Sequence, residues 1–375
     1  MRIYNCHTHI FTLEDTPEGF LKYGLGFLPD WVLELLKRLV LKKWMARLAL
    51  KLLRKPYAVK GLSFHLVGLL STSSQVFRNL QKFYPPGSRF VVLPLNFAHV
   101  GLGDLKVPYA QQLDELIQVK RSFPNDCLLF VHIDPREDTN ENNRKFIEKY
   151  LERGFSGIKM YTPLGYYPFD PRLEEVYRLA EEKAVPIVSH CSQGGIFYAG
   201  KELPKSFLRP QSFNPQAGGK YEFEAAKNEV FCDHFVHPER YIDVLEKFPK
   251  LKLCFAHFGW DTIEHRRKRI YHRKELYEGV KKLLLDERYP NLYADISYSL
   301  FDKKFSKQLK ADFEANPALQ DKVVFGTDYF MTLQEKLTES QLYEGFRADV
   351  GEAIFTKLAY ENPKRFLTSA YYRAS

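Results

Sequence analysis

Short runs of apolar and β-branched residues recur along the whole chain, with helix-like segments such as 172–183 and 238–248 between them. Eight runs have the length of strands, at residues 2–7, 90–96, 127–133, 155–161, 185–190, 251–257, 291–297 and 322–328. The alternation is typical of a parallel sheet covered by helices. Because eight parallel strands with helical crossovers close economically into a cylinder, we predict an α/β fold of the (β/α)8 (TIM) barrel type.

Two long segments interrupt this rhythm, and we expect both to be insertions in a single domain, 1–375. The first spans about 11–89, after strand one, and its part 31–55 holds eight Lys or Arg and one acid among apolar residues at helical spacing. We expect this basic helix to pack on the barrel or on a second subunit; contact with an anionic membrane is the alternative. The second, about 192–237 after strand five, is loop-like, and we expect it to be a lid or a substrate-selecting wall, with an ordered surface excursion as the alternative.

Composition narrows the class of protein only a little. With 375 residues, 45% of them hydrophobic, the chain can bury a large core. The net charge of +9 is compatible with anionic small molecules, membrane surfaces or nucleic acid and selects none of them, although no nucleic-acid fold signature accompanies it. The five cysteines form no C-x-x-C pair, the start has no signal-peptide pattern, and no uncharged run approaches the ~20 apolar residues of a membrane span. We therefore expect a cytoplasmic protein.

The candidate chemistry lies where the predicted strands end. Strand one ends in His7 and His9, which share one face of the strand because they are two residues apart. Strands five and eight end in His190 and Asp328. In a TIM barrel these ends meet at the active-site face, so the four side chains can surround one divalent ion and leave a position open. Imidazole and carboxylate ligands suit zinc, which we predict as the cofactor, with one ion favoured.

A metal site of this kind predicts hydrolytic chemistry. A bound metal ion lowers the pKa of water from 15.7 toward ~7, and Asp328 beside it is placed to act as general base as well as ligand. His257 ends strand six. It either binds a second ion or hydrogen-bonds the substrate and stabilises developing negative charge, and we favour the latter. Asp328 and His257 are thus the predicted catalytic residues.

Three side chains near the end of strand four are predicted to bind substrate: Lys159, Tyr161 and Tyr166. For Lys159 three roles stay open, namely a carbamylated bridge between two metal ions, an electrostatic clamp on a substrate carboxylate, and a plain rim lysine. His132 ends strand three; we expect it to be a core or rim histidine, and a supporting position behind the metal ligands is the alternative.

With these residues in place, the chain resembles the amidohydrolase superfamily, in its amidohydrolase-related (amidohydrolase 2) branch. The matching segments are 5–9, 157–165, 187–191, 248–259, 325–328 and 361–366. The resemblance implies a metal-dependent (β/α)8 enzyme, often zinc-bound, with His7, His9, His190 and Asp328 as ligands and His257 as a catalytic or binding residue. The chain departs from the family pattern at Asn5, where an Asp is common, and in its long basic insertion.

Members of this branch hydrolyse esters, lactones or amides, or remove carbon dioxide from aromatic and unsaturated acids. Our leading expectation is a metal-dependent hydrolase that cleaves an amide, ester or lactone bond of a small anionic substrate with metal-activated water. The alternative is a non-oxidative decarboxylase of a small aromatic or unsaturated carboxylic acid. A third interpretation is a membrane-associated binding scaffold that docks through 31–55. The expected partners are a small-molecule substrate and, through 31–55, a second copy of the chain or a membrane surface, but no nucleic acid.

Overall fold

The computed structural model of the chain describes residues 1–20, 72–213, 221–260, 273–334 and 337–374. The predicted basic helix at 31–55 lies outside these residues, so its packing, and the contact with a membrane or a second subunit expected of it, stay predictions.

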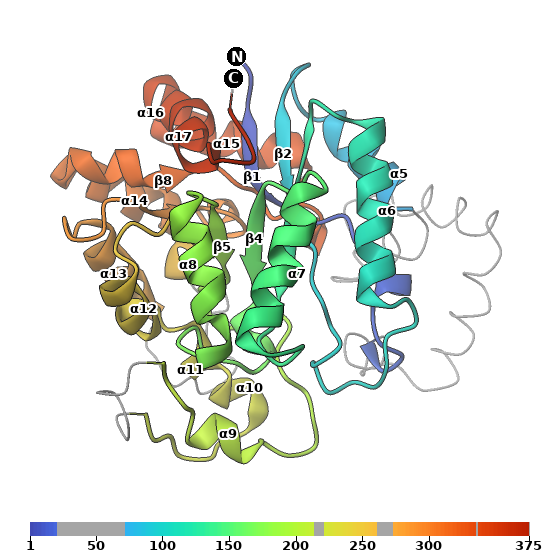
Figure 1. Cartoon of the computed structure of the whole chain (residues 1–375). Coiled ribbons are helices and arrows are strands. Elements are labelled where there is room, and N and C mark those ends of the chain that lie inside the picture. Colours follow the sequence, from blue (N-terminus) through green and yellow to red (C-terminus); the bar gives the residue numbers. More distant parts are fainter. Residues whose placement is uncertain (21–71, 214–220, 261–272, 335–336, 375) are drawn as a thin grey trace, which may run out of the picture.

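Eight parallel strands form the centre of the molecule, and each pairs with the next in chain order (Figure 1). They are β1 (Tyr4–Thr8), β2 (Arg89–Val92), β3 (Cys127–Ile133), β4 (Gly157–Met160), β5 (Ile187–Ser189), β6 (Leu253–Phe255), β7 (Leu292–Asp295) and β8 (Val323–Val324). The sheet closes where the Cys6 N–H donates to the Phe325 carbonyl at 2.8 Å, next to a bridge between Thr8 and Tyr329. The predicted (β/α)8 barrel is confirmed, and each strand falls at one of the eight apolar runs.

Helices surround the strands (Figure 1). The longer ones are α5 (Ser73–Gln81), α6 (Tyr109–Ser122), α7 (Asn140–Glu152), α8 (Glu174–Glu182), α13 (Arg273–Leu284), α14 (Lys303–Ala315) and α15 (Glu339–Val350), and the shorter ones are α12 (Ile242–Lys247), α16 (Glu352–Thr356) and α17 (Asn362–Leu367). Their starts follow from the sequence. Thr338 and Gln341, for example, form a capping box at α15 that satisfies backbone N–H groups of the first turn. Predicted segments 172–183 and 238–248 contain α8 and α12, each preceded by a 3-10 turn that begins with proline.

The strands separate an outer core from the barrel interior by simple alternation. Ile158 and Met160 of β4 belong to the core between strands and helices, whereas Leu128 and Phe130 of β3 belong to the cluster inside the barrel. A Cβ at Gly157 would lie 2.3 Å from the Phe130 ring, so the glycine faces the interior and leaves room for that ring. On the same inward faces, polar residues follow the apolar ones and lie near the C-terminal ends of the strands.

The insertion after β5 lies beyond the C-terminal ends of the strands, at the bottom of Figure 1. Its described part holds three short helices, α9 (Lys205–Leu208), α10 (Asn228–Phe231) and α11 (Asp233–Val236), where the sequence predicted only a loop. Aromatic rings join it to the loop after β4, where the ring centre of Tyr167 lies 4.6 Å from that of Phe235, and they pack within the insertion, where Phe207 lies 5.0 Å from Phe235. This packing is that of an ordered excursion, and a role as a lid stays a prediction.

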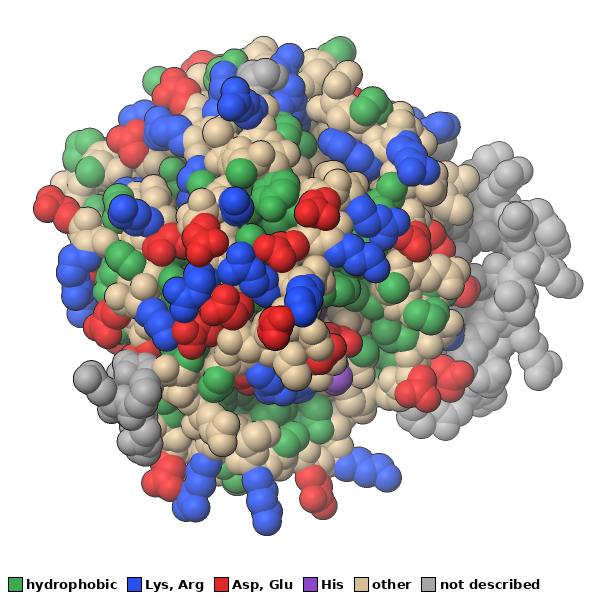
Figure 2. All heavy atoms as spheres, in the orientation of Figure 1, with side chains coloured by type: hydrophobic (Ala, Val, Ile, Leu, Met, Phe, Trp, Pro, Cys, Tyr) green, Lys and Arg blue, Asp and Glu red, His purple; other side chains and the backbone are tan. Residues whose placement is uncertain are grey.

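Lys, Arg, Asp and Glu side chains are interspersed over the face shown in Figure 2, so the positive charge there does not gather in one patch. Within the described ranges, every helix is too short or too polar to cross a bilayer.

Candidate metal centre

Three of the predicted ligands meet at the seam between the first and last strands. His7 and His9 lie at the end of β1, and Asp328 follows β8. Asp328 Oδ1 lies 3.0 Å from His9 Nε2 and 3.5 Å from His7 Nε2, and all three side chains are buried. The Asp328 N–H donates to the His7 carbonyl at 2.9 Å, so backbone pairing brings together residues more than 300 positions apart. Within the described residues, these three form one of the two groups able to hold a metal ion.

His190 and His257 stand beside this group. His190 follows β5 and His257 follows β6, and the His190 Nδ1 atom lies 3.1 Å from His257 Nε2. The ring of His257 is also 5.0 Å from that of His7, centre to centre. His190 is not one of the three residues whose ligand atoms lie within 4.8 Å of one another. Its place as a fourth ligand therefore stays a prediction, although it borders the centre.

Each of the four histidines has one ring nitrogen against an oxygen of the surrounding protein. The pairs are His7 Nδ1 with Asp295 Oδ2 at 2.8 Å, His9 Nδ1 with Leu93 O at 2.7 Å, His257 Nδ1 with Ser297 O at 2.9 Å, and His190 Nε2 with Ser192 O at 3.1 Å. A neutral imidazole has one N–H, and these oxygens are hydrogen-bond acceptors, so we assign the proton to that nitrogen. The other nitrogen of each ring then presents a lone pair. Burial lowers the pKa of His7 to about 4 and that of His190 well below its usual value, which keeps both rings neutral.

The lone pairs face one another rather than a donor. His190 Nδ1 faces His257 Nε2 at 3.1 Å, and His9 Nε2 faces Asp328 Oδ1 at 3.0 Å. Asp328 Oδ1 has no hydrogen-bond partner in the described part of the chain. Burial alone would raise the pKa of Asp328, but a proton on the neighbouring His9 or His7 ring favours the charged carboxylate and brings the pKa to about 2, so Asp328 is ionised at neutral pH. Facing acceptors repel unless a cation lies among them, and nitrogen and carboxylate ligands fit a divalent metal ion.

Asp295, at the end of β7, orients this set, and it was not among the residues predicted from the sequence. Its Oδ2 accepts from His7, and its Oδ1 accepts from the backbone N–H groups of His257 and Ser297, both at 3.0 Å. Burial would raise the pKa of Asp295, but the His7 ring outweighs it and holds the pKa well below its usual range. A carboxylate behind a ligating histidine fixes the ring and raises its basicity. The signal was present, because the apolar run 291–297 also contains an acid near its end.

A second buried network lies behind the backbone of His7. Asn5 Oδ1 accepts from the N–H groups of His7 at 3.2 Å and Thr327 at 3.1 Å, while Asn5 Nδ2 donates to Tyr84 Oη at 2.9 Å and Thr327 Oγ1 at 2.7 Å. Both hydroxyls donate to Oε1 of Glu339, a buried acid whose pKa burial raises to about 7. The network joins β1 to the segment after β8. No pattern in the sequence singles out Glu339, which has the appearance of an ordinary acid in the first turn of a helix.

The three predicted substrate-binding residues lie in different surroundings. Lys159 is 0% exposed, and its Nζ has no hydrogen-bond partner among the described residues. The interpretation as a plain rim lysine is therefore wrong, because the amine lies inside the barrel. Tyr161 borders the centre, with its ring 4.5 Å from that of His190 and its hydroxyl accepting from the Ile196 N–H.

Tyr166 is engaged with the backbone. Its hydroxyl donates to the Ile133 carbonyl at 3.0 Å and accepts from the Tyr161 N–H at 2.9 Å. The single proton of the hydroxyl is thus used within the protein, and the residue supports the position of Tyr161.

The backbone is strained at the centre. His257 and Asp328 both have φ of +64°, in the left-handed region that costs a non-glycine residue about 1 kcal/mol or more. Such strain persists where surrounding structure enforces it, and it often marks functional sites. Close approach also matters at Gly326, since a Cβ there would lie 2.7 Å from His7 Cβ.

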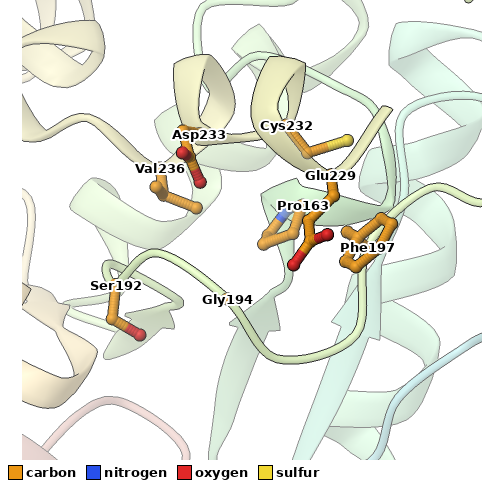
Figure 3. Close-up of a pocket in the computed structure, with 8 residues that line it drawn as sticks. All are labelled: Pro163, Ser192, Gly194, Phe197, Glu229, Cys232, Asp233 and Val236. Carbon is orange, nitrogen blue, oxygen red and sulfur yellow. The ribbon is translucent and has the colours of Figure 1, made fainter. Parts of the chain in front are cut away.

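A hollow borders the centre on the side of the insertion (Figure 3). It lies between Pro163, the loop with Ser192 and Gly194, and residues of α10 and α11, and its empty volume is about 180 Å³ including space open to solvent. Ser192 connects it to the centre through His190. Figure 3 draws the carboxylates of Glu229 and Asp233 on its α10–α11 side, so this wall of the hollow is acidic.

Comparison with solved structures agrees with the observed fold. A probable 2-pyrone-4,6-dicarboxylic acid hydrolase from Acinetobacter baumannii is 11% identical over 98% of this chain and 99% of that chain, with a TM-score of 0.54. A 5-carboxyvanillate decarboxylase from Novosphingobium aromaticivorans, complexed with manganese, is 14% identical over 98% of this chain and 96% of that chain, with a TM-score of 0.53. A 4-oxalomesaconate hydratase from Rhodopseudomonas palustris is 14% identical over 97% of this chain and 95% of that chain, with a TM-score of 0.51. At this identity the likeness shows the fold alone.

The family follows from the sequence. No curated protein matches the chain, but the family model described as amidohydrolase matches residues 110–368. This segment holds β3 to β8 and therefore His190, His257, Asp295 and Asp328. The family and the His–Asp groups together support binding of a divalent metal ion. The chain belongs to the amidohydrolase family, as its motifs predicted, and is an enzyme of that superfamily.

Proposed function

We propose that this protein is a metal-dependent hydrolase that cleaves an amide, ester or lactone bond of a small anionic molecule. One observation carries the proposal. Four buried histidines have their protons tied outward to protein oxygens, and their remaining lone pairs converge with an ionised carboxylate, Asp328. A site composed only of acceptors is suited to a cation.

His7, His9 and Asp328 would hold the ion, with His190 as the predicted fourth ligand, and we propose one zinc ion. When bound, a divalent ion polarises a substrate carbonyl and makes water a nucleophile at neutral pH. Asp328, ionised at the centre, would take a proton from the attacking water. His257 would accept a hydrogen bond at Nε2 from the substrate or from the attacking water, because its Nδ1 proton is donated to the Ser297 carbonyl. Lys159 would attract the anionic group of the substrate.

A non-oxidative decarboxylase is the second candidate, and the buried amine of Lys159 favours it. An ammonium group inside the barrel that has no partner among the described residues would hold a carboxylate in a water-poor surrounding. Both reactions need the same metal centre, and they differ in whether water attacks the substrate.

The membrane-associated scaffold is less well supported, because its site residues would then have no need to converge. Association with a second copy of the chain, contact with a membrane and location in the cytoplasm remain expectations from the sequence.

The test compares metal-stripped and zinc- or manganese-reconstituted protein on a panel of lactones, esters, amides and aromatic carboxylic acids. Incorporation of labelled oxygen from water indicates hydrolysis, and release of carbon dioxide indicates decarboxylation. We expect turnover to depend on metal and to be lost in His9→Ala and Asp328→Asn. His237→Gln serves as the control, since His237 is a buried histidine near Glu239 and Glu275 rather than at the centre. Full turnover in metal-stripped protein would contradict the proposal.

A further inference from the structure

Two buried polar side chains on neighbouring strands lie near the metal centre without being candidate ligands. His132 of β3 and Lys159 of β4 are paired in register, and they are 1% and 0% exposed. His132 Nε2 and Lys159 Nζ both lack a hydrogen-bond partner among the described residues. Buried polar groups are nearly always satisfied in folded proteins, so two unsatisfied ones side by side need an explanation.

Both side chains face the interior of the barrel. Leu128 and Phe130 of β3 lie in the interior cluster, and His132 is two residues further along the same face. Gly157 faces the Phe130 ring from β4, and Lys159 is two residues further along that face. His132 and Lys159 are therefore neighbours on the inner wall, toward the end where the strands stop.

The free atoms of both side chains are donors. The Asn96 N–H donates to His132 Nδ1 at 3.3 Å, so Nδ1 is the acceptor and the ring proton lies on Nε2. Burial lowers the pKa of His132 to about 3, which keeps this ring neutral. Lys159 carries only donors at its amine, and burial lowers its pKa only to about 8, so it is charged at neutral pH. The wall thus presents one neutral N–H and one ammonium group that find no acceptor in the described part of the chain.

This pair lies close to the candidate metal centre. The charge of Lys159 lowers the pKa of both His7 and His190, and the carboxylates of Asp295 and Asp328 in turn favour the charged form of Lys159. The amine also lies 5.7 Å from the ring centre of Tyr161, which borders His190. A molecule held at the centre would have the donor pair within its reach.

We propose that His132 and Lys159 form a subsite that binds a carboxylate group of the substrate beside the metal centre. The inference rests on the proposed function, which it makes more specific. A carboxylate has one negative charge and two acceptor oxygens. The charge matches the ammonium group of Lys159, and the second oxygen can accept from the neutral N–H of His132. A phosphate dianion would be better matched by two free positive groups, and Arg136, whose charge also reaches His132, is already paired with Asp134.

The test measures binding of simple probes by calorimetry. Acetate and benzoate are compared with acetamide and benzamide, in metal-loaded and in metal-free protein. We expect Lys159→Met to weaken benzoate binding about tenfold or more and His132→Phe to weaken it about three- to tenfold, because hydrogen bonds to charged groups are the stronger class. Benzamide binding and the metal Kd should stay within about threefold of wild type, while Lys120→Met, a partly buried lysine on α6, should change none of these values.

A measurement on the wild-type protein covers the case in which a variant fails to fold. Cyanate modifies lysine amines, and peptide mass spectrometry gives its rate at Lys159. We expect benzoate, but not benzamide, to slow this reaction. Equal protection by both probes, or no binding of either carboxylate to wild type, would overturn the subsite.

The carbamylated bridge is the competing role for Lys159. It predicts a carbamate signal in ¹³C NMR with labelled bicarbonate, lost in Lys159→Met together with metal affinity, and that result would also overturn the subsite. Failure of the proposed function has a different signature. The protein would then bind no metal, while the carboxylate probes would still report on His132 and Lys159 in the metal-free protein.

Discussion

Substitution of Glu339 should weaken metal binding, although Glu339 touches no candidate ligand. Its Oε1 accepts from the hydroxyls of Tyr84 and Thr327. Because each hydroxyl gives its proton to Glu339, each is left to accept from Asn5 Nδ2. The amide of Asn5 is thereby oriented so that its oxygen accepts from the N–H groups of His7 and Thr327. His7 lies at the end of β1, and Thr327 directly precedes Asp328, so both sides of the metal centre are held.

The magnitude follows from the bonds that are lost. Glu339→Met leaves two buried hydroxyls without an acceptor, at about 1–3 kcal/mol each. Part of this cost in stability is offset, because the substitution also removes an acid whose burial is unfavourable, as its raised pKa indicates. Loss of a residue that holds metal ligands in position typically lowers metal affinity about 10- to 100-fold. We expect the metal Kd of Glu339→Met to rise by a factor in that range. Glu339→Gln retains an acceptor oxygen at the same place, so its metal Kd should stay within about threefold of wild type.

The direction of the hydrogen bonds supplies a sharper test. Asn5→Asp places a second acceptor against two hydroxyls that each have one proton, so the single variant should lose at least about tenfold in metal affinity. When Asn5→Asp is combined with Glu339→Gln, every bond can reverse, since the introduced amide group can donate to the hydroxyls and the hydroxyls can donate to the introduced carboxylate. The double variant should therefore bind metal at least about tenfold more tightly than Asn5→Asp alone.

The assay is competition of each folded variant with a chromophoric chelator for zinc, alongside thermal unfolding of the metal-free protein. The matched control is Asp243→Leu, which removes a buried acid that accepts from Tyr221 at 2.5 Å, away from the centre. It should lower the unfolding temperature without changing the metal Kd. The reasoning is refuted if Glu339→Met only lowers the unfolding temperature, as the control does, or if the double variant binds metal no better than Asn5→Asp.

Three further predictions concern single side chains. Asp295→Asn should weaken metal binding by about 10- to 100-fold, because the amide cannot orient the His7 ring as the carboxylate does; a chelator competition that gives the wild-type Kd would contradict this. Gly326→Ala should reduce metal affinity more than stability, since the added methyl would lie 2.7 Å from His7 Cβ; equal metal content after dialysis of wild type and variant would count against it. For His132, the folded pKa of about 3 lies below the ordinary 6.5, so the unfolded chain binds more protons between these values and stability rises with pH across that window, by up to about 1.4 kcal/mol per unit. Urea unfolding of metal-free His132→Phe should therefore show a smaller stability difference between acid and neutral pH than wild type, and an unchanged difference would show that His132 does not titrate in this way.

The fold could be predicted from the sequence because its main signals are local. Each buried strand is an apolar run, and a parallel barrel needs no long-range information beyond their number and the helices between them. The same logic placed His7, His9 and Asp328 together, since strand ends meet at one face of a barrel.

What could not be predicted depends on side-chain packing across the fold. Lys159 lies two residues beyond Gly157 on an inward face, and only the arrangement of β3 and β4 shows that it is buried beside His132. Glu339 reaches the site from a helix through two hydroxyls, a route that no local pattern reveals. The short helices after β5 form within a segment rich in Gly and Pro, where aromatic contacts with the loop after β4 outweigh weak local preference.

The central claim is that buried histidines and Asp328 converge on one metal ion, and anomalous diffraction from crystals grown with zinc tests it most directly. We predict a single strong anomalous peak about 2.0–2.2 Å from His7 Nε2, His9 Nε2 and Asp328 Oδ1. A crystal without a peak among these atoms, in protein that binds zinc elsewhere or not at all, would contradict the account.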